Sequence, residues 1–555
     1  MADHEGGELR VHGPHSVDAE QLAAMLRSDG ERDAAARVEP DGPGLDEEHP
    51  PLPRDTAVTA HGAPHVEERE ETDLASGDAG PPPTPAPTKS WQAALTAKGG
   101  FPADAQIAVS TTHVIVTSRQ RIRYYDKNGN ALGNDISSTT FFTAGLNLKD
   151  AAGNPIDRFN DLRVIFDSFR KRFWVTAYAG YSGAANVAAA KRRTFVPIAV
   201  SKTQNPQDGW YFYYWDGAAQ EGKANSSIWK PGDAPDYPII GIDKVAVTIT
   251  HSVNNTSGFR YWRVTLTPAD PLANGQAQGG WQFWNLKNPD GSTPWVIAPA
   301  VHHGTPKGGR AYWLGRQGSD SIVIWAITHP FDAQRKLQAV AVKLKNGFGT
   351  PVNGQQQGST KLIKFTNLSN AVMKASFRNE FLHGVTNDVH DWGGIGKPRT
   401  SIHYVRLPVS NWPNVPQPPS SGGVDRVFGG GNAGETVGGL KHYGWAAVEA
   451  NKNGDAIIGY VRTGEQIYPE VRASAYMANE SDIRPSRQVK GGDKAADNPG
   501  SSYSAPGSVL PWGDTCGASV DPSDDTGIWI AQEYASTTAN NNGNYDIWVA
   551  KFFGG

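Results

Sequence analysis

A unit of several short β-type runs recurs along most of this chain and constrains its fold more than any other feature. From Phe101 onward these runs, many of them aromatic, alternate with clusters of Asp, Ser, Gly and Asn that are typical of turns. The unit from Trp512 to Phe553 contains three such runs, at 517–520, 528–532 and 547–552. A single meander of this kind cannot bury its own faces, so the units must pack against one another.

Units of about four strands each are typical of a β-propeller, in which blades pack face to face around a central channel. Convincing helix patterns are absent from the repeating region. The sequence therefore predicts an all-β fold, a seven-bladed β-propeller, with six blades as the alternative. The expected blades are 101–145, 159–217, 236–286, 295–365, 370–428, 443–477 and 512–553.

The first 90 residues have a different composition from the rest of the chain. They contain no Phe, Trp or Tyr, and they carry 7 Lys and Arg against 20 Asp and Glu, a net charge of −13 that leaves +9 on the remainder. A segment this acidic and this poor in large apolar groups cannot offset its ordering entropy. We therefore expect residues 1–90 to be a disordered tail, in which Pro81–Pro87 acts as a stiff spacer, and residues 91–555 to form the propeller.

One part of the tail has the pattern of a short helix, over residues 18–28. Asp18 can cap it together with Gln21, and the apolar side chains of Leu22, Met25 and Leu26 share one face. Two interpretations are open: a docking or sorting element that folds on a partner, and a transient helix in a disordered tail.

Acidic residues bracket several of the predicted innermost strands. Asp161, Asp236 and Asp514 each precede such a strand, which would place three carboxyl groups at one rim of the channel. They could bind sugar hydroxyls or a cation, or they could simply hold turn amides. Further candidates for the rim are Tyr237, His383, His390, Tyr443 and Trp512, with the loop-rich stretch Phe381–Trp392 as the best single place for a histidine site.

Two turns resemble calcium loops because oxygen-bearing side chains alternate along them, Asp126–Asn130 and Asn451–Asp455. Asn-Gly between β-type runs is also a strong hairpin signal, which we favour. Calcium is the only cofactor that these patterns suggest.

Several classes of protein are not indicated. The basic clusters at 170–172 and 191–193 lie beside strands or in loops, so no nucleic-acid partner is predicted. No transmembrane segment or signal peptide is predicted, and the single cysteine, Cys516, fits a buried core position. These features predict synthesis in the cytoplasm, with packaging or a non-classical export route as the alternatives for its destination.

The order of several motifs resembles one group of proteins. DLRVIFD with RKRFWVTA, VPIAVSKTQNPQDGWYFY, DYPIIGID with VAVTIT, NGDAIIGYVRTG, and WGD before VDPSDDTGIWIAQEY are similar to bacterial, usually secreted, sialidase-like multi-bladed propellers that mostly lack an assigned activity. The resemblance covers about residues 101–553. It departs from the pattern at Thr515 and Cys516, where an aromatic residue is more usual, and in the missing signal peptide.

Two functions follow as hypotheses. The first is a non-catalytic propeller that binds a glycan, a surface polymer or a protein on one face, localised by its N-terminal tail as cargo of a protein shell or a contractile injection machine. The alternative is a glycoside hydrolase or polysaccharide lyase that uses acids at the channel mouth. No coherent catalytic set is visible in the sequence, which favours the first.

Overall fold

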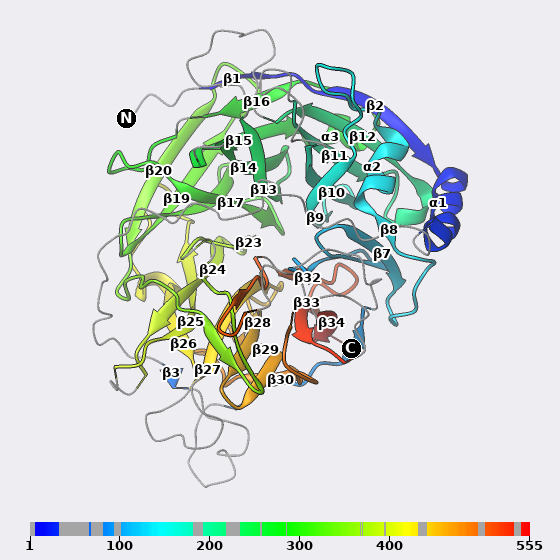
Figure 1. Cartoon of the computed structure of the whole chain (residues 1–555). Coiled ribbons are helices and arrows are strands. Elements are labelled where there is room, and N and C mark those ends of the chain that lie inside the picture. Colours follow the sequence, from blue (N-terminus) through cyan, green and yellow to red (C-terminus); the bar gives the residue numbers. More distant parts are fainter. Residues whose placement is uncertain are drawn as a thin grey trace.

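The structure is a computed structural model that describes residues 6–32, 66–67, 82–93, 102–180, 193–217, 233–255, 258–284, 286–366, 368, 370–392, 396–430, 441–497, 505–514, 516–537 and 545–554. Antiparallel pairing among these residues groups the strands into successive meanders arranged around a common axis (Figure 1). We call each meander a blade and number them I to VII in chain order.

The strands of the first four blades follow one another along the chain. Blade I contains β5 (Gln106–Val109), β6 (His113–Thr117), β7 (Arg121–Asp126) and β8 (Ile136–Ser137). Blade II contains β9 (Arg158–Asp167), β10 (Arg172–Gly180), β11 (Phe195–Ser201) and β12 (Gly209–Asp216). Blade III contains β13 (Ala234–Ile242), β14 (Ala246–Asn255), β15 (Gly258–Pro268) and β16 (Gly280–Phe283). Blade IV contains β17 (Trp295–His302), β18 (Ala311–Gln317), β19 (Ser321–Thr328) and β20 (Lys336–Lys343).

The remaining blades follow the same plan, except that the last one borrows a strand from far upstream. Blade V contains β23 (Lys374–Arg378), β24 (Phe381–His390), β25 (Arg399–Pro408) and β26 (Val424–Gly429). Blade VI contains β27 (Lys441–Ala450), β28 (Ala456–Gly464), β29 (Ile467–Tyr476) and β30 (Arg487–Lys490). Blade VII contains β32 (Gly517–Val520), β33 (Ile528–Ala535), β34 (Tyr545–Phe552) and β4 (Lys89–Gln92). A small sheet of β21 (Gly354–Gln356), β22 (Ser359–Ile363) and β31 (Val509–Leu510) lies outside these blades.

The innermost strands form a closed ring. β5, β9, β13, β17, β23, β27 and β32 each contact the next in this order, and β32 contacts β5. Parallel pairing of β13 with β17, and of β17 with β23, shows that these neighbouring strands run in the same direction along the ring axis. The predicted all-β propeller fold is therefore confirmed. We call the end of the axis at which the innermost strands begin the mouth.

Large aromatic side chains fill the spaces within and between the blades, as expected for stacked sheets that share a core. Among the described residues, the fully buried tryptophans are Trp174, Trp210, Trp215, Trp262, Trp313, Trp325, Trp445, Trp512 and Trp529. Two short helices, α2 (Ser138–Gly145) and α3 (Ala269–Ala273), interrupt a region for which no helix was predicted. Each lies in a connection that follows a strand, so the β pattern around it is preserved.

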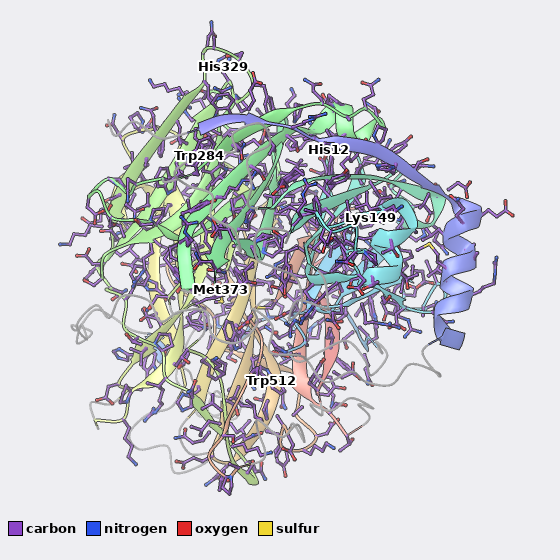
Figure 2. All side chains as sticks on the ribbon, turned by 45° about the horizontal axis from the view of Figure 1, so that its top comes forward. His12, Lys149, Trp284, His329, Met373 and Trp512 are labelled. Atoms are coloured by element: carbon purple, nitrogen blue, oxygen red, sulfur yellow. The ribbon has the colours of Figure 1, made fainter. Side chains whose placement is uncertain are left out.

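The start of the predicted disordered tail is ordered, which corrects that expectation for residues 6–32. β1 (Gly6–Leu9) adds a fifth strand to blade III by pairing with β16, and β2 (His12–Asp18) adds one to blade II by pairing with β12. Figure 1 shows this segment along the outer side of the ring, and Figure 2 labels His12 on it. The composition argument failed because an edge strand offers backbone partners, which a segment without aromatic residues can use.

The predicted helix is present as α1 (Ala19–Arg32). Its capping box forms as expected, because the Asp18 amide donates to Gln21 Oε1 at 3.0 Å and the Gln21 amide donates to Asp18 Oδ1 at 2.9 Å. Leu22 and Leu26 are buried in the core shared by blades I and II, and Met25 packs against the same core. The apolar face expected to meet a partner therefore meets the propeller itself.

Other parts of residues 1–93 also contact the ring. β3 (Val66–Glu67) pairs in parallel with β26 of blade V. Within the predicted proline spacer, Thr84 is fully buried: its amide donates to Pro485 O at 3.2 Å, and its hydroxyl accepts from the Ala475 amide at 2.9 Å. We call residues 6–32 and 82–93 the strap. The predicted disorder of residues 33–65 and 68–81 lies outside the described residues.

Candidate functional site

An unusual backbone conformation recurs where the innermost strands begin. Asp104, Asp161, Tyr237 and Asp514 have positive φ angles of 51°, 56°, 52° and 56°. In blades II and III this residue lies in a break of the strand register, between Asn160 and Arg163 and between Asp236 and Ile239. Val296 of β17 and Trp445 of β27 share this conformation, with φ angles of 49° and 55°, so it is a repeated structural feature of the blades.

These residues from four blades meet at the mouth. Asp104 interacts electrostatically with Asp514 and Asp161, and the Tyr237 hydroxyl donates to the carbonyl oxygen of Asp514 at 2.8 Å. That bond joins blade III to the segment that precedes β32 of blade VII. Together with Glu533, described below, we call these side chains the mouth cluster. Asp161 and Asp514, which the sequence analysis placed at one rim, both interact with Asp104.

Asp104 is the most buried of the three aspartates at the mouth, Asp104, Asp161 and Asp514, that have a positive φ. It is only 3% exposed, and its Oδ1 has no hydrogen-bond partner among the described residues. Burial, and then the neighbouring Asp514 and Asp161, raise the pKa of Asp104 well above its ordinary value. The charges of Arg163 and Arg119 lower the pKa of Asp104 and offset this rise only in part.

Glu533 on β33 adds another buried carboxyl group. It is 1% exposed, its Oε2 accepts from the Ala103 amide at 3.3 Å, and the Gly513 backbone amide also interacts with its carboxyl group. Burial raises the pKa of Glu533 well above its usual value, and Asp514 adds to the rise. The mouth cluster therefore holds two buried acids whose pKa values are raised chiefly by burial.

Two arginines beside the mouth cluster, Arg119 and Arg163, contact other residues of the protein. Arg119 pairs with Asp161 at 3.6 Å. Arg163 Nε donates to Pro238 O at 2.8 Å, and its guanidinium lies over the Tyr237 ring at 4.9 Å. Burial raises the pKa of Tyr237 well above its ordinary value, so its hydroxyl remains a donor. The arginines fix the carboxyl and phenol groups instead of presenting a free anion-binding set.

Asp236, which the sequence placed beside Asp161 and Asp514, accepts hydrogen bonds within blade III. Its Oδ1 accepts from the Tyr237 amide at 2.9 Å, and its Oδ2 accepts from Asn254 Nδ2 at 3.3 Å. The register break puts Tyr237, one residue later, in the position that Asp161 occupies in blade II. Asp236 thus holds amides, which was the simpler of its two interpretations.

The predicted histidines do not converge on the mouth. His383 is buried, its Nδ1 lies 2.8 Å from the Tyr404 hydroxyl, and burial lowers its pKa to about 3. His390, at the other end of β24, packs edge-on against Trp392 at 4.5 Å, and burial lowers its pKa. Within the described residues, no group of three or more His, Cys, Asp or Glu side chains is placed to hold a metal ion.

Two other predicted rim residues are packing residues. Tyr443 is fully buried and stacks on Tyr460 at 5.0 Å, beside a small hollow that Phe428 also lines. Trp512 is also fully buried, and it meets Tyr545 edge-on at 6.4 Å. Neither side chain offers a surface to a ligand.

The two calcium-like turns are hairpin turns that satisfy their own polar groups. Asp126 Oδ1 accepts from the amides of Asn128 at 2.8 Å and Asn130 at 2.9 Å. Lys89 of the strap donates to Asn128 Oδ1 at 2.9 Å, which supplies a positive charge where a cation was considered. In the second turn, the Asn451 side chain accepts from backbone amides in the same way. Calcium binding remains an untested prediction.

A further charged group lies between blades IV, V and VI. Glu449 Oε2 is 3.0 Å from His303 Nε2 and accepts from the Ser376 hydroxyl at 2.6 Å, while Lys374 Nζ lies 3.6 Å from Oε1. Charge pairing outweighs burial and lowers the pKa of Glu449. Since every member has a partner within the group, its evident role is to join three innermost strands.

Sequence reasoning missed Asp104 and Glu533. Asp104 stands two residues before Gln106, the first residue of β5, in the stretch PADAQIAV. In the same way, Asp161 stands two residues before Arg163, where regular pairing of β9 with β10 resumes. That spacing was a usable signal, but blade I lacks the second acid of the bracketing pattern. Glu533 comes from a second strand, so nothing in the order of the chain connects it with the other acids.

Comparisons with known proteins add little about function. No protein-family model and no curated protein matches the chain. Similar solved structures include a sialidase from Trypanosoma rangeli, with 11% identity, a TM-score of 0.33 and coverage of 73% of this chain and 57% of that one. An α-L-arabinanase from Cellvibrio cellulosa has 10% identity, a TM-score of 0.29 and coverage of 59% and 95%.

A protein of unknown function from Dyadobacter fermentans has 12% identity, a TM-score of 0.34 and coverage of 84% and 98%. The match to the Trypanosoma rangeli sialidase spans little more than half the length of that protein. In the part of the chain that the structure describes, no helix is long and apolar enough to cross a membrane. At these identities and TM-scores the likeness carries no functional argument, so the functional case rests on the mouth cluster.

Proposed function

We propose that this protein is a binding propeller that takes a polyhydroxylated glycan at the mouth of its ring. The observation that carries the proposal is the meeting of Asp161 and Asp514, from two blades, beside Asp104, with the Tyr237 hydroxyl held on the backbone carbonyl of Asp514. Asp514 is partly exposed, and the Asp161 side chain keeps 13% of its surface accessible. Carboxyl oxygens of this kind accept hydrogen bonds from neighbouring sugar hydroxyls, and convergent polar groups set ligand orientation.

Preorganisation supports binding at this place. Arg119 and Tyr237 hold the groups that a ligand would meet, so little side-chain entropy is lost when the ligand arrives. The occupied state of both arginines disfavours an acidic sugar, because a carboxylate ligand would need a free guanidinium pair. The expected ligand class is therefore a neutral or cationic glycan.

A glycan array with the full chain tests this proposal directly. Wild type should bind a defined set of glycans, and Asp514→Asn and Asp161→Asn should each weaken that binding at least about tenfold, which is about 1.4 kcal/mol. Asp332→Asn, at a carboxyl group that is 54% exposed and belongs to blade IV, is the matched control and should bind as wild type does. Unchanged binding by both mouth variants would remove the site from this function.

A glycoside hydrolase is the second candidate, and one observation favours it. Asp104 carries a raised pKa beside the carboxyl groups of Asp161 and Asp514, and such separation of acids is how one site obtains a proton donor and a second carboxylate. In this case Asp104 would protonate the leaving oxygen, and Asp514 or Asp161 would act as nucleophile or base. Chromatography of glycans incubated with wild type and Asp104→Asn separates the candidates: new reducing ends without an unsaturated sugar at the other end, made only by wild type, would establish hydrolysis.

The proposed loading of this propeller as cargo needs a different surface from the one expected. Leu22 and Leu26 are buried, so a shell or injection machine would have to recognise the outer face of α1, where Glu20, Ala24 and Arg27 are exposed. Substituting these three residues, and comparing the packaged fraction with wild type, tests this part of the proposal. An unchanged fraction would exclude α1 as the loading element.

A further inference from the structure

The N-terminal part of the chain covers the outer edges of most blades. β1 and β2 extend blades III and II, and α1 packs on the core shared by blades I and II. β3 pairs with the outermost strand of blade V, and Thr84 binds the Ala475 amide of blade VI. β4 completes blade VII. Strand addition at a blade edge is thus a contact that this protein uses repeatedly.

Blade IV differs from its neighbours. Within the described ranges, its outermost strand β20 pairs with β19 and with no other strand. Figure 1 shows β20 on the outer side of the ring. β34 of blade VII, which has the same length of 8 residues and pairs with β4, is almost wholly buried, whereas most side chains of β20 are partly accessible.

The accessible side chains of β20 make it a good template for another strand. Its apolar residues that remain partly accessible are Leu337, Ala339, Val340 and Ala341. The backbone edge that faces away from β19 can pair with an extended peptide, as the edges of β12 and β16 do with β2 and β1. The peptide gains affinity from main-chain hydrogen bonds and specificity from its alternate side chains.

Positive charge surrounds this edge. The cationic residues along β20 and at its ends are Arg335, Lys336, Lys343 and Lys345, and the acidic ones on the adjoining turns are Asp320 and Asp332. Residues 319–346 therefore carry a net charge of +2 with His329 neutral. Lys343 Nζ pairs with Asp320 at 3.1 Å, but both side chains are exposed, so this pair is open to competition.

The charges decide between two kinds of occupant. If β20 paired in register with β20 of a second copy, antiparallel, Lys336 would face Lys343 at both ends, and like charges directly opposite destabilise a strand pair. An acidic strand reverses the sign of these contacts. The segments that cover the edges of blades II, III and V come from the first 90 residues, whose net charge is −13.

We propose that β20 receives an extended, acidic peptide of a partner protein as a further strand of blade IV. Carboxylates of the peptide face Lys336 and Lys343, and its alternate apolar side chains pack beside Leu337 and Val340. This docking edge lies on the outer side of the ring and does not involve the mouth cluster. Failure of the glycan proposal would leave it standing, and its own failure would leave the glycan proposal standing.

Fluorescence anisotropy tests the proposal with a labelled peptide as long as β20 that alternates Val and Glu. Titrated with the full chain at about 0.15 M salt, this peptide should bind at least about tenfold more tightly than its fully N-methylated counterpart, which keeps the charge but loses its backbone donors. Lys336→Glu combined with Lys343→Glu should weaken binding at least about tenfold. Lys149→Glu combined with Lys244→Glu, at exposed lysines outside blade IV, is the matched control and should bind as wild type does.

Hydrogen exchange of the wild-type chain locates the peptide and keeps the test decisive if the double variant does not fold. Peptide binding should slow exchange in 336–343. Absence of binding, or equal binding of the N-methylated peptide, overturns the proposal. So does slowed exchange on β12 or β16 in place of β20, which would mean that the peptide displaces the strap. A dimer in sedimentation whose β20 amides are protected without peptide would make a second copy the occupant and would also overturn it.

Discussion

Blade V contains a buried charged triad whose contribution to stability depends on pH in a defined direction. His403 on β25 lies between Asp388 on β24, at 2.9 Å, and Asp425 on β26, at 2.7 Å, and the ring is fully buried. The hydrogen bonds and charges of the two carboxylates outweigh burial and raise the pKa of His403 to about 9. Both aspartates also accept backbone amides of the connection between blades IV and V, such as that of Gly349.

The magnitude follows from the difference between the folded and unfolded pKa values. Taking about 6.5 for the unfolded chain, the rise of His403 is roughly 2.5 units, which at 1.36 kcal/mol per unit is about 3 kcal/mol. Because the folded pKa is raised, this stabilisation is fully present below about pH 6.5. It is lost as the pH rises from there through about 9.

Urea unfolding followed by tryptophan fluorescence at several pH values across this window measures the effect. As the pH rises from about 6.5 through about 9, the unfolding free energy of wild type should fall by about 3 kcal/mol, and that of His403→Gln should not show this fall. His383→Gln is the control, because burial lowers the pKa of His383 to about 3 and the ring is neutral throughout the window. Parallel pH profiles for wild type and His403→Gln would refute the argument.

Three further substitutions test other parts of the fold. Leu22→Ala should lower the unfolding free energy by about 2–5 kcal/mol in urea, since the side chain is 1% exposed, and no loss would mean that α1 does not dock. Thr84→Val should lower the melting temperature, because it leaves the Ala475 amide without its 2.9 Å acceptor at a cost of about 1–3 kcal/mol, and an unchanged value would contradict the strap contact. Gly513→Ala should reduce near-ultraviolet circular dichroism, because its Cβ would lie 2.2 Å from the Trp445 ring at a φ of 79°; native spectra would show that this contact can relax.

Features set by neighbours in the chain were predictable from the sequence. The meanders depend on β-type runs separated by turn residues, and both signals are local. The cap of α1 was predicted from Asp18 and Gln21 alone, and both hydrogen bonds form. The hairpin interpretation of the turn at Asp126 was likewise sound, because its carboxylate finds its donors within four residues.

Features that depend on distant partners were not predictable in the same way. Edge pairing of β1 and β2 uses backbone groups, so the side-chain composition of the segment gave no signal for it. The exchange of Asp236 for Tyr237 at the mouth results from a register break that shifts one residue. Glu533 reaches the cluster from β33 only because blade VII packs against blade I, as its hydrogen bond with the Ala103 amide shows.

The outermost strand of blade VII has a consequence for the timing of folding. β4 pairs with β34, and the Thr88 hydroxyl donates to Lys551 O across 463 positions of the chain. At an elongation rate of 5–20 residues per second, β4 leaves the ribosome roughly 20–90 s before its partner exists. The ring can therefore close only late, and Trp91 stays without its native neighbours during synthesis. High contact order of this kind slows folding, which gives chaperones that shield an unpaired strand a longer interval in which to act.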